Sequence, residues 1–226
     1  MSRPTLSRQA FRLVLLATLV VLALNACGGG KEQADRPRPL PEEPKALRPE
    51  TYRSEEFKPS LTFRVGKGWK HMPHEQSDSM VISWGDEPRE MGFANIQDVY
   101  KSNETGSKLV KAPDDLVGWF EHHPYLETSE PKPVTVGGVK GKQFDGRMGE
   151  LPERYFGDCG EQCVDITMTD DGTVLGAHKG FKYHAFVLED VKGETVLMGF
   201  SSPTSEFDAF APKARKVVDS VKWTGS

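Results

Sequence analysis

Two stretches in the second half of the chain alternate apolar and polar residues on either side of a glycine-containing turn. The first is Pro133–Asp145, which contains Gly137-Gly138, and the second consists of Phe181–Glu189 and Glu194–Ser201 with the turn Asp190-Val191-Lys192-Gly193 between them. Alternation with a period of two is typical of a strand with one buried face, and glycine supplies the positive φ angles of tight hairpin turns. The sequence therefore predicts two β-hairpins, whose strands pair in antiparallel fashion.

Shorter runs of β-branched and aromatic residues predict further strands. These are Leu61–Val65, a short strand around Trp69, Ser79–Trp84, Gly92–Ile96, Val164–Met168 and a last short strand at Trp223. A polar loop is expected at Lys101–Gly106.

One helix is expected to open at Ala112-Pro113-Asp114-Asp115-Leu116, with Pro113 in its first turn. Leu116, Trp119 and Phe120 fall on one face at positions i, i+3 and i+4, and the helix is expected to end at His122-His123. A histidine pair suggests a metal site, but adjacent helical residues point about 100° apart and do not converge. We expect both histidines to favour the negative end of the helix.

A second helix is expected near the C-terminus. Ser205–Phe210 predicts a first helical turn or two, and Pro212 is expected to start the main helix, which runs through Ser220. An antiparallel sheet with two amphipathic helices predicts an α+β domain in which helices cover the sheet, as in an α/β/α sandwich.

The same elements carry a family resemblance. The run Val134–Gly141 (VTVGGVKG), followed by Gly193–Val196 and by Phe207 to Trp223, resembles the PsbP-like fold and its layout in bacterial lipoproteins. The resemblance covers Leu61 to Trp223. That family has no shared catalytic set, so it implies no site residues here, and its better-known members bind or assemble with other proteins.

The N-terminal segment has the layout of an export signal. Arg3, Arg8 and Arg12 precede the apolar run Leu13–Leu24. A basic region followed by such a run is a secretory signal. The run is too short to cross about 30 Å of hydrocarbon, which takes about 20 apolar residues.

The signal ends in Leu24-Asn25-Ala26-Cys27, which resembles the lipobox of bacterial lipoproteins, although Asn25 is a less usual residue there. The resemblance implies that residues 1–26 are removed and that Cys27 carries a diacylglyceryl lipid. Two acyl chains hold a protein stably on a membrane. The alternatives are an ordinary secreted protein cut near Ala26 and an uncleaved membrane anchor.

Residues 27–50 are expected to be a tether, because glycines are followed by closely spaced prolines that favour extended polyproline II. A Pro-x-x-Pro ligand motif at Pro41–Pro44 is the alternative interpretation. Residues 51–226 are then a single extracytoplasmic domain, anchored to the cell membrane through the lipid on Cys27.

Two further cysteines, Cys159 and Cys163, are separated by three residues. Outside the cytoplasm such a pair is expected to form a disulfide. The alternatives are a redox pair, which usually has two intervening residues, and half of a metal site completed by His178 or His184.

Charge argues against nucleic acid as a partner. Without the three signal arginines, 26 of the 29 basic residues remain against 33 acidic ones, which gives a net charge of −7. Nucleic-acid-binding domains favour a basic face.

No nucleophile elbow, zinc-protease motif, phosphate loop or dinucleotide fingerprint occurs in the chain. We therefore expect a binding or interaction module, without a cofactor, that holds an envelope protein or a small molecule. Its ligand-binding residues are unknown. The loops around Trp69, Trp84 and the cysteine pair are the candidate contacts, with core tryptophans as the alternative. An envelope enzyme with an unrecognised site and a metal-handling lipoprotein are the competing functions.

Overall fold

The computed structural model describes residues 36–226 apart from several short gaps. These are Glu87, 102–107, Arg154, Phe156, 158–161, Asp171, Thr173 and Ser226, together with the side chains of Pro73, His74 and Val174. The expected signal, Cys27, Cys159 and most of the expected loop at Lys101–Gly106 lie outside the described residues. Pro37–Ser226 forms one unit, to which the strands and helices named in this section belong. Within the described residues, no helix has the length and apolar character needed to cross a membrane.

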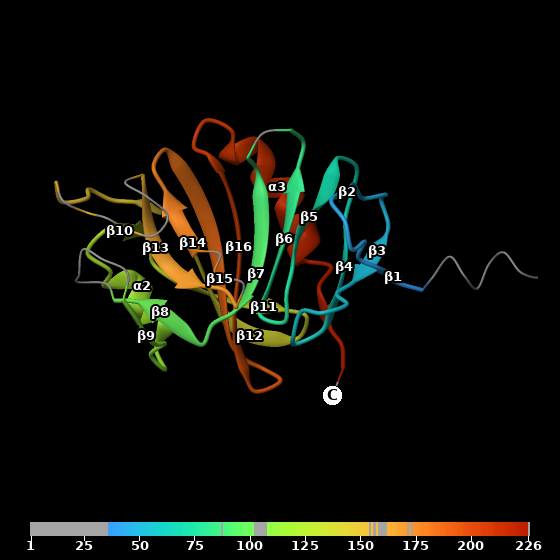
Figure 1. Cartoon of the computed structure of the whole chain (residues 1–226), viewed down its shortest axis with the longest axis horizontal. Helices are drawn as coiled ribbons and strands as arrows, with labels where there is room; N and C mark the ends of the chain where they lie inside the picture. The colour runs from blue at the N-terminus through green and yellow to red at the C-terminus, as the bar shows by residue number, and fades with distance from the viewer. Residues whose placement is uncertain are drawn as a thin grey trace, which may run out of the picture. The chain divides into compact units, whose positions relative to one another are not determined.

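A nine-stranded antiparallel sheet forms the centre of this unit (Figure 1). The strand order is β10-β12-β15-β16-β7-β6-β5-β2, and β11 pairs with the first half of β12. Their bounds are β2 Lys45–Ala46, β5 Trp69–Glu75, β6 Ser79–Trp84, β7 Glu90–Asn95, β10 Leu126–Thr128, β11 Lys132–Val136, β12 Val139–Met148, β15 Phe181–Val191 and β16 Glu194–Pro203.

Both predicted hairpins are present. Gly137 and Gly138 turn between β11 and β12 with φ angles of 57° and 87°, as a two-residue hairpin turn requires. The turn between β15 and β16 is shorter than expected and consists of Lys192 and Gly193, with φ angles of 60° and 90°. The register shifts between Leu188 and Val191, and Val191 then pairs with Glu194, so both strands continue up to this turn.

One face of the sheet is covered by α3 (Phe207–Val218) and by a small four-stranded sheet. The small sheet consists of β1 Arg38–Pro39, β3 Thr51–Arg53, β4 Leu61–Arg64 and β17 Lys222–Trp223. The main core lies between these layers, where the ring of Phe210 contacts Trp69 and Phe200.

The expected helix start at Pro212 is wrong, because α3 is one helix with Pro212 inside it. A proline inside a helix removes a hydrogen bond and costs about 3 kcal/mol. The helix nevertheless begins earlier, since its first turn places Phe207 and Phe210 in the core at 4% and 1% exposure.

The other face is covered mainly by two hairpins rather than by helices. They are β8 (Asp98–Tyr100) with β9 (Leu109–Lys111), and β13 (Cys163–Met168) with β14 (Val174–His178). The helix on this face, α2 (Leu116–Glu121), has six residues and is capped by Asp115, which accepts from the Gly118 N–H. The antiparallel sheet is confirmed. The expected α/β/α sandwich contains more helix than the structure, because β-strands form most of the layer on this face.

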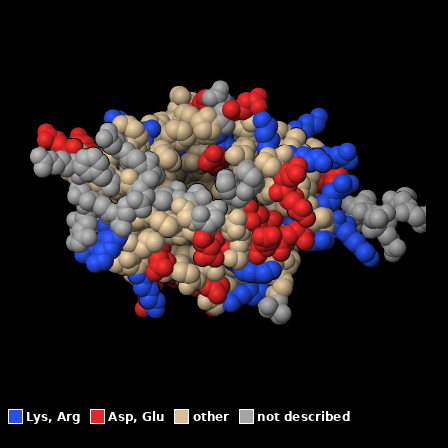
Figure 2. Space-filling model, viewed as in Figure 1, with Lys and Arg blue, Asp and Glu red and all other residues tan. Residues whose placement is uncertain are grey.

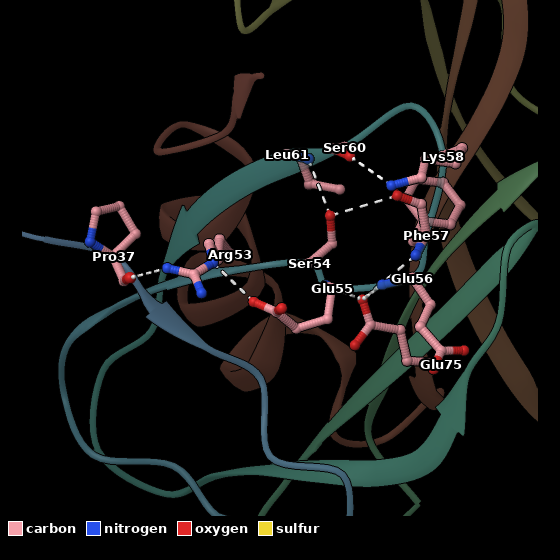
Figure 3. Close-up of polar contacts among 10 residues, drawn as sticks. All are labelled: Pro37, Arg53, Ser54, Glu55, Glu56, Phe57, Lys58, Ser60, Leu61 and Glu75. Carbon is pink, nitrogen blue, oxygen red and sulfur yellow. Dashed lines mark hydrogen bonds and ion pairs between the residues drawn. The ribbon is translucent and has the colours of Figure 1, made fainter. Parts of the chain in front are cut away.

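The expected tether ends earlier than residue 50. From Pro37 onward the chain belongs to the folded unit, since β1 pairs with β3 and β2 pairs with β5. Leu40 and Leu47 are 3% and 6% exposed in the main core. Figure 3 shows the Arg53 guanidinium donating to the Pro37 carbonyl, at 3.3 Å. Prolines are compatible with this pairing because short strands at sheet edges need few N–H donors.

The turn between β3 and β4 is held by a carboxylate from β5 (Figure 3). One oxygen of Glu75 accepts from the backbone N–H groups of Glu55, Glu56 and Phe57, at 2.6, 3.1 and 3.4 Å. The same turn places the Phe57 ring in the core at 0% exposure. Glu75 therefore connects the small sheet to the large one through otherwise unpaired backbone donors.

Candidate functional site: a hollow over the central sheet

Three small residues lie next to one another across the middle of the central sheet. Gly92 on β7 is opposite Gly199 on β16, and Gly199 is opposite Ala185 on β15. Val81 on β6 continues the row beyond Gly92. A Cβ added to Gly92 would meet no atom within 4 Å, whereas a Cβ added to Gly199 would lie 3.1 Å from the His184 carbonyl oxygen. Because these positions lack side chains of ordinary size, the sheet face carries a hollow that its own residues do not fill.

This hollow has a volume of about 330 Å³ and is lined mainly by apolar side chains. Phe120 from α2, Ile166 from β13 and Leu175 from β14 stand beside the glycine floor. Figure 2 shows this face hollowed over β16 and β7, with acidic atoms beside the hollow. The volume is at the small end of the range for ligand pockets, about 300–1,000 Å³.

The β13–β14 hairpin forms one wall and is held in place by polar contacts. Near its tip, Ser77 donates to the Asp170 carboxylate at 3.0 Å, and the Asp170 N–H donates to Asp78 at 2.7 Å. Along β13, Thr167 donates to the Asp98 carbonyl at 2.7 Å. The wall is therefore fixed to the β5–β6 turn and to β8, which keeps the hollow open.

One end of the hollow is polar. Glu90 lies two residues before Gly92 on β7 and faces the same side, because side chains alternate along a strand. Ser201 is opposite Glu90, and Tyr183 is opposite Ser201. The Tyr183 hydroxyl lies over Gly146 on β12, where it is buried without a hydrogen-bond partner among the described residues, and burial raises its pKa above the ordinary value. The hollow thus has an apolar body and a polar end.

The candidate tryptophans do not line this hollow. Trp69 is 2% exposed in the main core, as the alternative interpretation states. Trp84 donates from Nε1 to the Lys67 carbonyl at 3.0 Å, and its ring lies under the cations of Arg89 and Lys213. Both rings therefore stabilise the face that carries α3.

Cys163 is buried on β13, whereas Cys159 lies outside the described residues, so the disulfide stays a prediction. His178 on β14 is opposite Cys163 and lines the hollow. The His184 ring faces the other side of the sheet and stacks on Phe200 at 5.3 Å. The structure therefore does not bring the rings of His178 and His184 together, and the described residues contain no group of three metal-ligating side chains.

His184 instead forms a polar cluster that no sequence pattern predicts. Its Nδ1 lies 2.7 Å from Asp145, which Lys182 also contacts at 3.0 Å. Burial lowers the pKa of His184 despite this carboxylate. For Asp145, burial raises the pKa, but the hydrogen bonds from His184 and Lys182 outweigh it and the pKa is lowered.

The described contacts of the Asp145–His184 pair include no nucleophile, which would be the third member of a catalytic triad. His184 Nε2 faces the Gln143 side-chain oxygen at 3.3 Å, and Arg215 donates to that same oxygen at 2.7 Å. A nucleophile would have to occupy this position. The geometry favours a structural role, in which the cluster fixes α3 to the sheet. Residues from β12, β15 and α3 form it, so only the sheet register reveals it.

The two histidines after α2 differ from each other. His122 Nδ1 lies 2.7 Å from the Gly118 carbonyl, which agrees with the expected contact at the helix end. His123 is 5% exposed, and burial lowers its pKa to about 4. It is therefore neutral near pH 7, and the expectation that it supplies positive charge to the helix end is wrong.

Comparisons with known proteins give several similar solved structures, among them the two named below. No protein-family model and no curated protein matches the chain. Cyanobacterial PsbP (CyanoP) from Synechocystis sp. PCC 6803 is 12% identical, with a TM-score of 0.41 over 79% of this chain and 95% of that one. LpqN, involved in cell envelope biogenesis of Mycobacterium tuberculosis, is 12% identical, with a TM-score of 0.30 over 84% and 90%. The first is of the PsbP type that the sequence resembles. At these TM-scores neither decides the function of this chain.

Proposed function

We propose that this protein is a lipid-anchored extracytoplasmic binding module that holds a small, largely apolar molecule in the hollow over its central sheet. The observation that carries the proposal is the floor made by Gly92 and Gly199. Adjacent glycines weaken a sheet, because glycine loses more entropy on folding and packs no side chain. The β15 backbone lies close to Gly199, but the space above Gly92 is open, and the cost of Gly92 is offset if that space serves a ligand.

The walls of the hollow support binding rather than catalysis. Its body presents Phe120, Ile166 and Leu175, and apolar walls with a few polar groups are typical of small-molecule sites. The hydrogen-bonded pair Asp145 and His184 lies on the opposite face, where it cannot reach a molecule in the hollow.

The anchor is the part of the proposal that rests on sequence. Leu13–Cys27 combines an export signal with a lipobox-like ending, and a diacylglyceryl group on Cys27 would hold the module at the membrane surface. Cys27→Ser should move the protein from the membrane fraction to the soluble fraction or block its processing. Unchanged membrane association in this variant would contradict lipid attachment at Cys27.

Probe binding tests the hollow. The full chain carrying Cys27→Ser, which has no lipid to occupy the site, is titrated with N-phenyl-1-naphthylamine, a neutral apolar dye that fluoresces in apolar surroundings. We expect saturable binding that Gly92→Leu removes, because a leucine at this position fills the hollow without a clash at its Cβ.

Gly66→Leu is the matched control, since a Cβ there also meets nothing within 4 Å, but Gly66 does not line the hollow. It should bind the dye like the parent protein. Equal dye binding by the Gly92→Leu variant would refute a ligand site in the hollow.

A further inference from the structure

We infer that the hollow selects amphiphiles with a positively charged head group, such as long-chain amines, and that Glu90 recognises that head. The inference rests on the proposed function, because it concerns the same site. It goes further by assigning the chemistry of the ligand and the direction in which the ligand lies.

The residues that line the hollow change from apolar to polar along β7 and β16. At one end, Ala94 and Leu197 are opposite each other in the β7–β16 register, and Gly92 and Gly199 form the next row on this face. At the other end, Glu90 is opposite Ser201. A chain lying along β7 would therefore have its apolar tail over the small residues and its head beside a carboxylate.

Glu90 is suited to this role because it is exposed and no described side chain forms an ion pair with it. Its neighbour Arg89 points to the opposite face, where it pairs with Glu206 at 2.5 Å and lies over the Trp84 ring. The lining residues that the structure describes include no lysine or arginine. Of the two histidines among them, His184 turns its ring to the opposite face, and His178 is exposed on β14.

This charge arrangement discriminates between head groups. An ammonium ion beside Glu90 gains a charge-assisted hydrogen bond, and a neutral hydroxyl gains an ordinary one. A carboxylate would face like charge, which raises the free energy of the complex. The apolar body is the same for all three, so the head group decides their order of affinity.

The experiment measures displacement of N-phenyl-1-naphthylamine from the full chain carrying Cys27→Ser by decylamine, decanol and decanoate at pH 7. We expect decylamine to bind most tightly and decanoate most weakly. Glu90→Gln should weaken decylamine binding about fivefold, the upper end for an exposed ion pair, and leave decanol binding unchanged. Glu189→Gln, which removes an exposed carboxylate that does not line the hollow, should change none of the affinities.

The outcomes separate the two proposals. If the dye binds and all three competitors displace it equally, or if Glu90→Gln leaves decylamine unaffected, selection of cationic heads is refuted and the binding module stands. If decanoate binds best, the site prefers anionic heads and the inference is wrong. If the dye does not bind the parent protein, both proposals fall.

Discussion

The buried imidazole of His123 should make the protein less stable in mild acid. Its Nδ1 accepts a hydrogen bond from the Tyr125 N–H at 3.2 Å, and its ring packs on Trp119 at 4.8 Å. Protonation would remove this acceptor and place a charge among aromatic rings. Burial accordingly lowers the pKa from 6.5 to about 4 in the folded state.

The sign and size of the effect follow from proton linkage. Near pH 7 the ring is neutral in both states, so it contributes little pH dependence. Between pH 6.5 and pH 4 the unfolded chain binds a proton that the folded chain does not, so the free energy of unfolding falls as the pH is lowered. From pH 7 to pH 5 the loss is about 2 kcal/mol.

Urea unfolding at both pH values measures this loss, with His123→Gln as the test variant and His122→Gln as the control. The glutamine at position 123 does not titrate, so this variant should lose about 2 kcal/mol less than the parent between pH 7 and pH 5. His122→Gln removes an exposed histidine one residue away and should behave like the parent. Parallel pH profiles for the parent and His123→Gln would refute the assignment of a buried neutral ring.

Three further predictions concern the scaffold. Glu75→Ala should lower the free energy of unfolding by about 2 kcal/mol in urea, since it leaves three backbone donors of the β3–β4 turn without their acceptor; a change as small as that of Glu189→Ala would contradict this. Pro212→Ala should raise the Tm, because it restores an N–H donor inside α3, and a lower Tm would show that the proline is needed where it stands. Mass spectrometry of the unreduced protein should show a mass two hydrogens lower than that of the reduced chain, from a Cys159–Cys163 disulfide; labelling of both thiols without reductant would exclude it.

Local patterns were sufficient to predict most of the central strands. β6 has the bounds Ser79–Trp84 expected from its β-branched and aromatic residues, and the Gly137-Gly138 turn is where the sequence predicts it. These signals are short-range, since a strand and its hairpin partner are adjacent in the chain. The sequence does not predict that residues 37–50 belong to the folded unit, because their two buried leucines, Leu40 and Leu47, are too few to form a periodic pattern.

The candidate site could not be predicted in the same way. Gly92 and Gly199 are each an isolated glycine in a strand pattern, which by itself indicates a bulge or a close backbone approach. That they lie side by side under the hollow depends on the β7–β16 register, which pairs residues about a hundred positions apart. The Asp145–His184 contact likewise depends on the pairing of β12 with β15. Neither pairing leaves a periodic pattern in the local sequence from which it could be predicted.

The pairing of β7 with β16 has a consequence for when the site forms. The central sheet has two halves in chain order: β2, β5, β6 and β7 end by Asn95, and β10 to β12, β15 and β16 begin at Leu126 or later. The hollow lies at the seam between these halves, with Gly92 supplied by one and Gly199 by the other. Pairings so distant in sequence are slow to form. A newly synthesised chain would therefore have no hollow until β16, its last long strand, is in place.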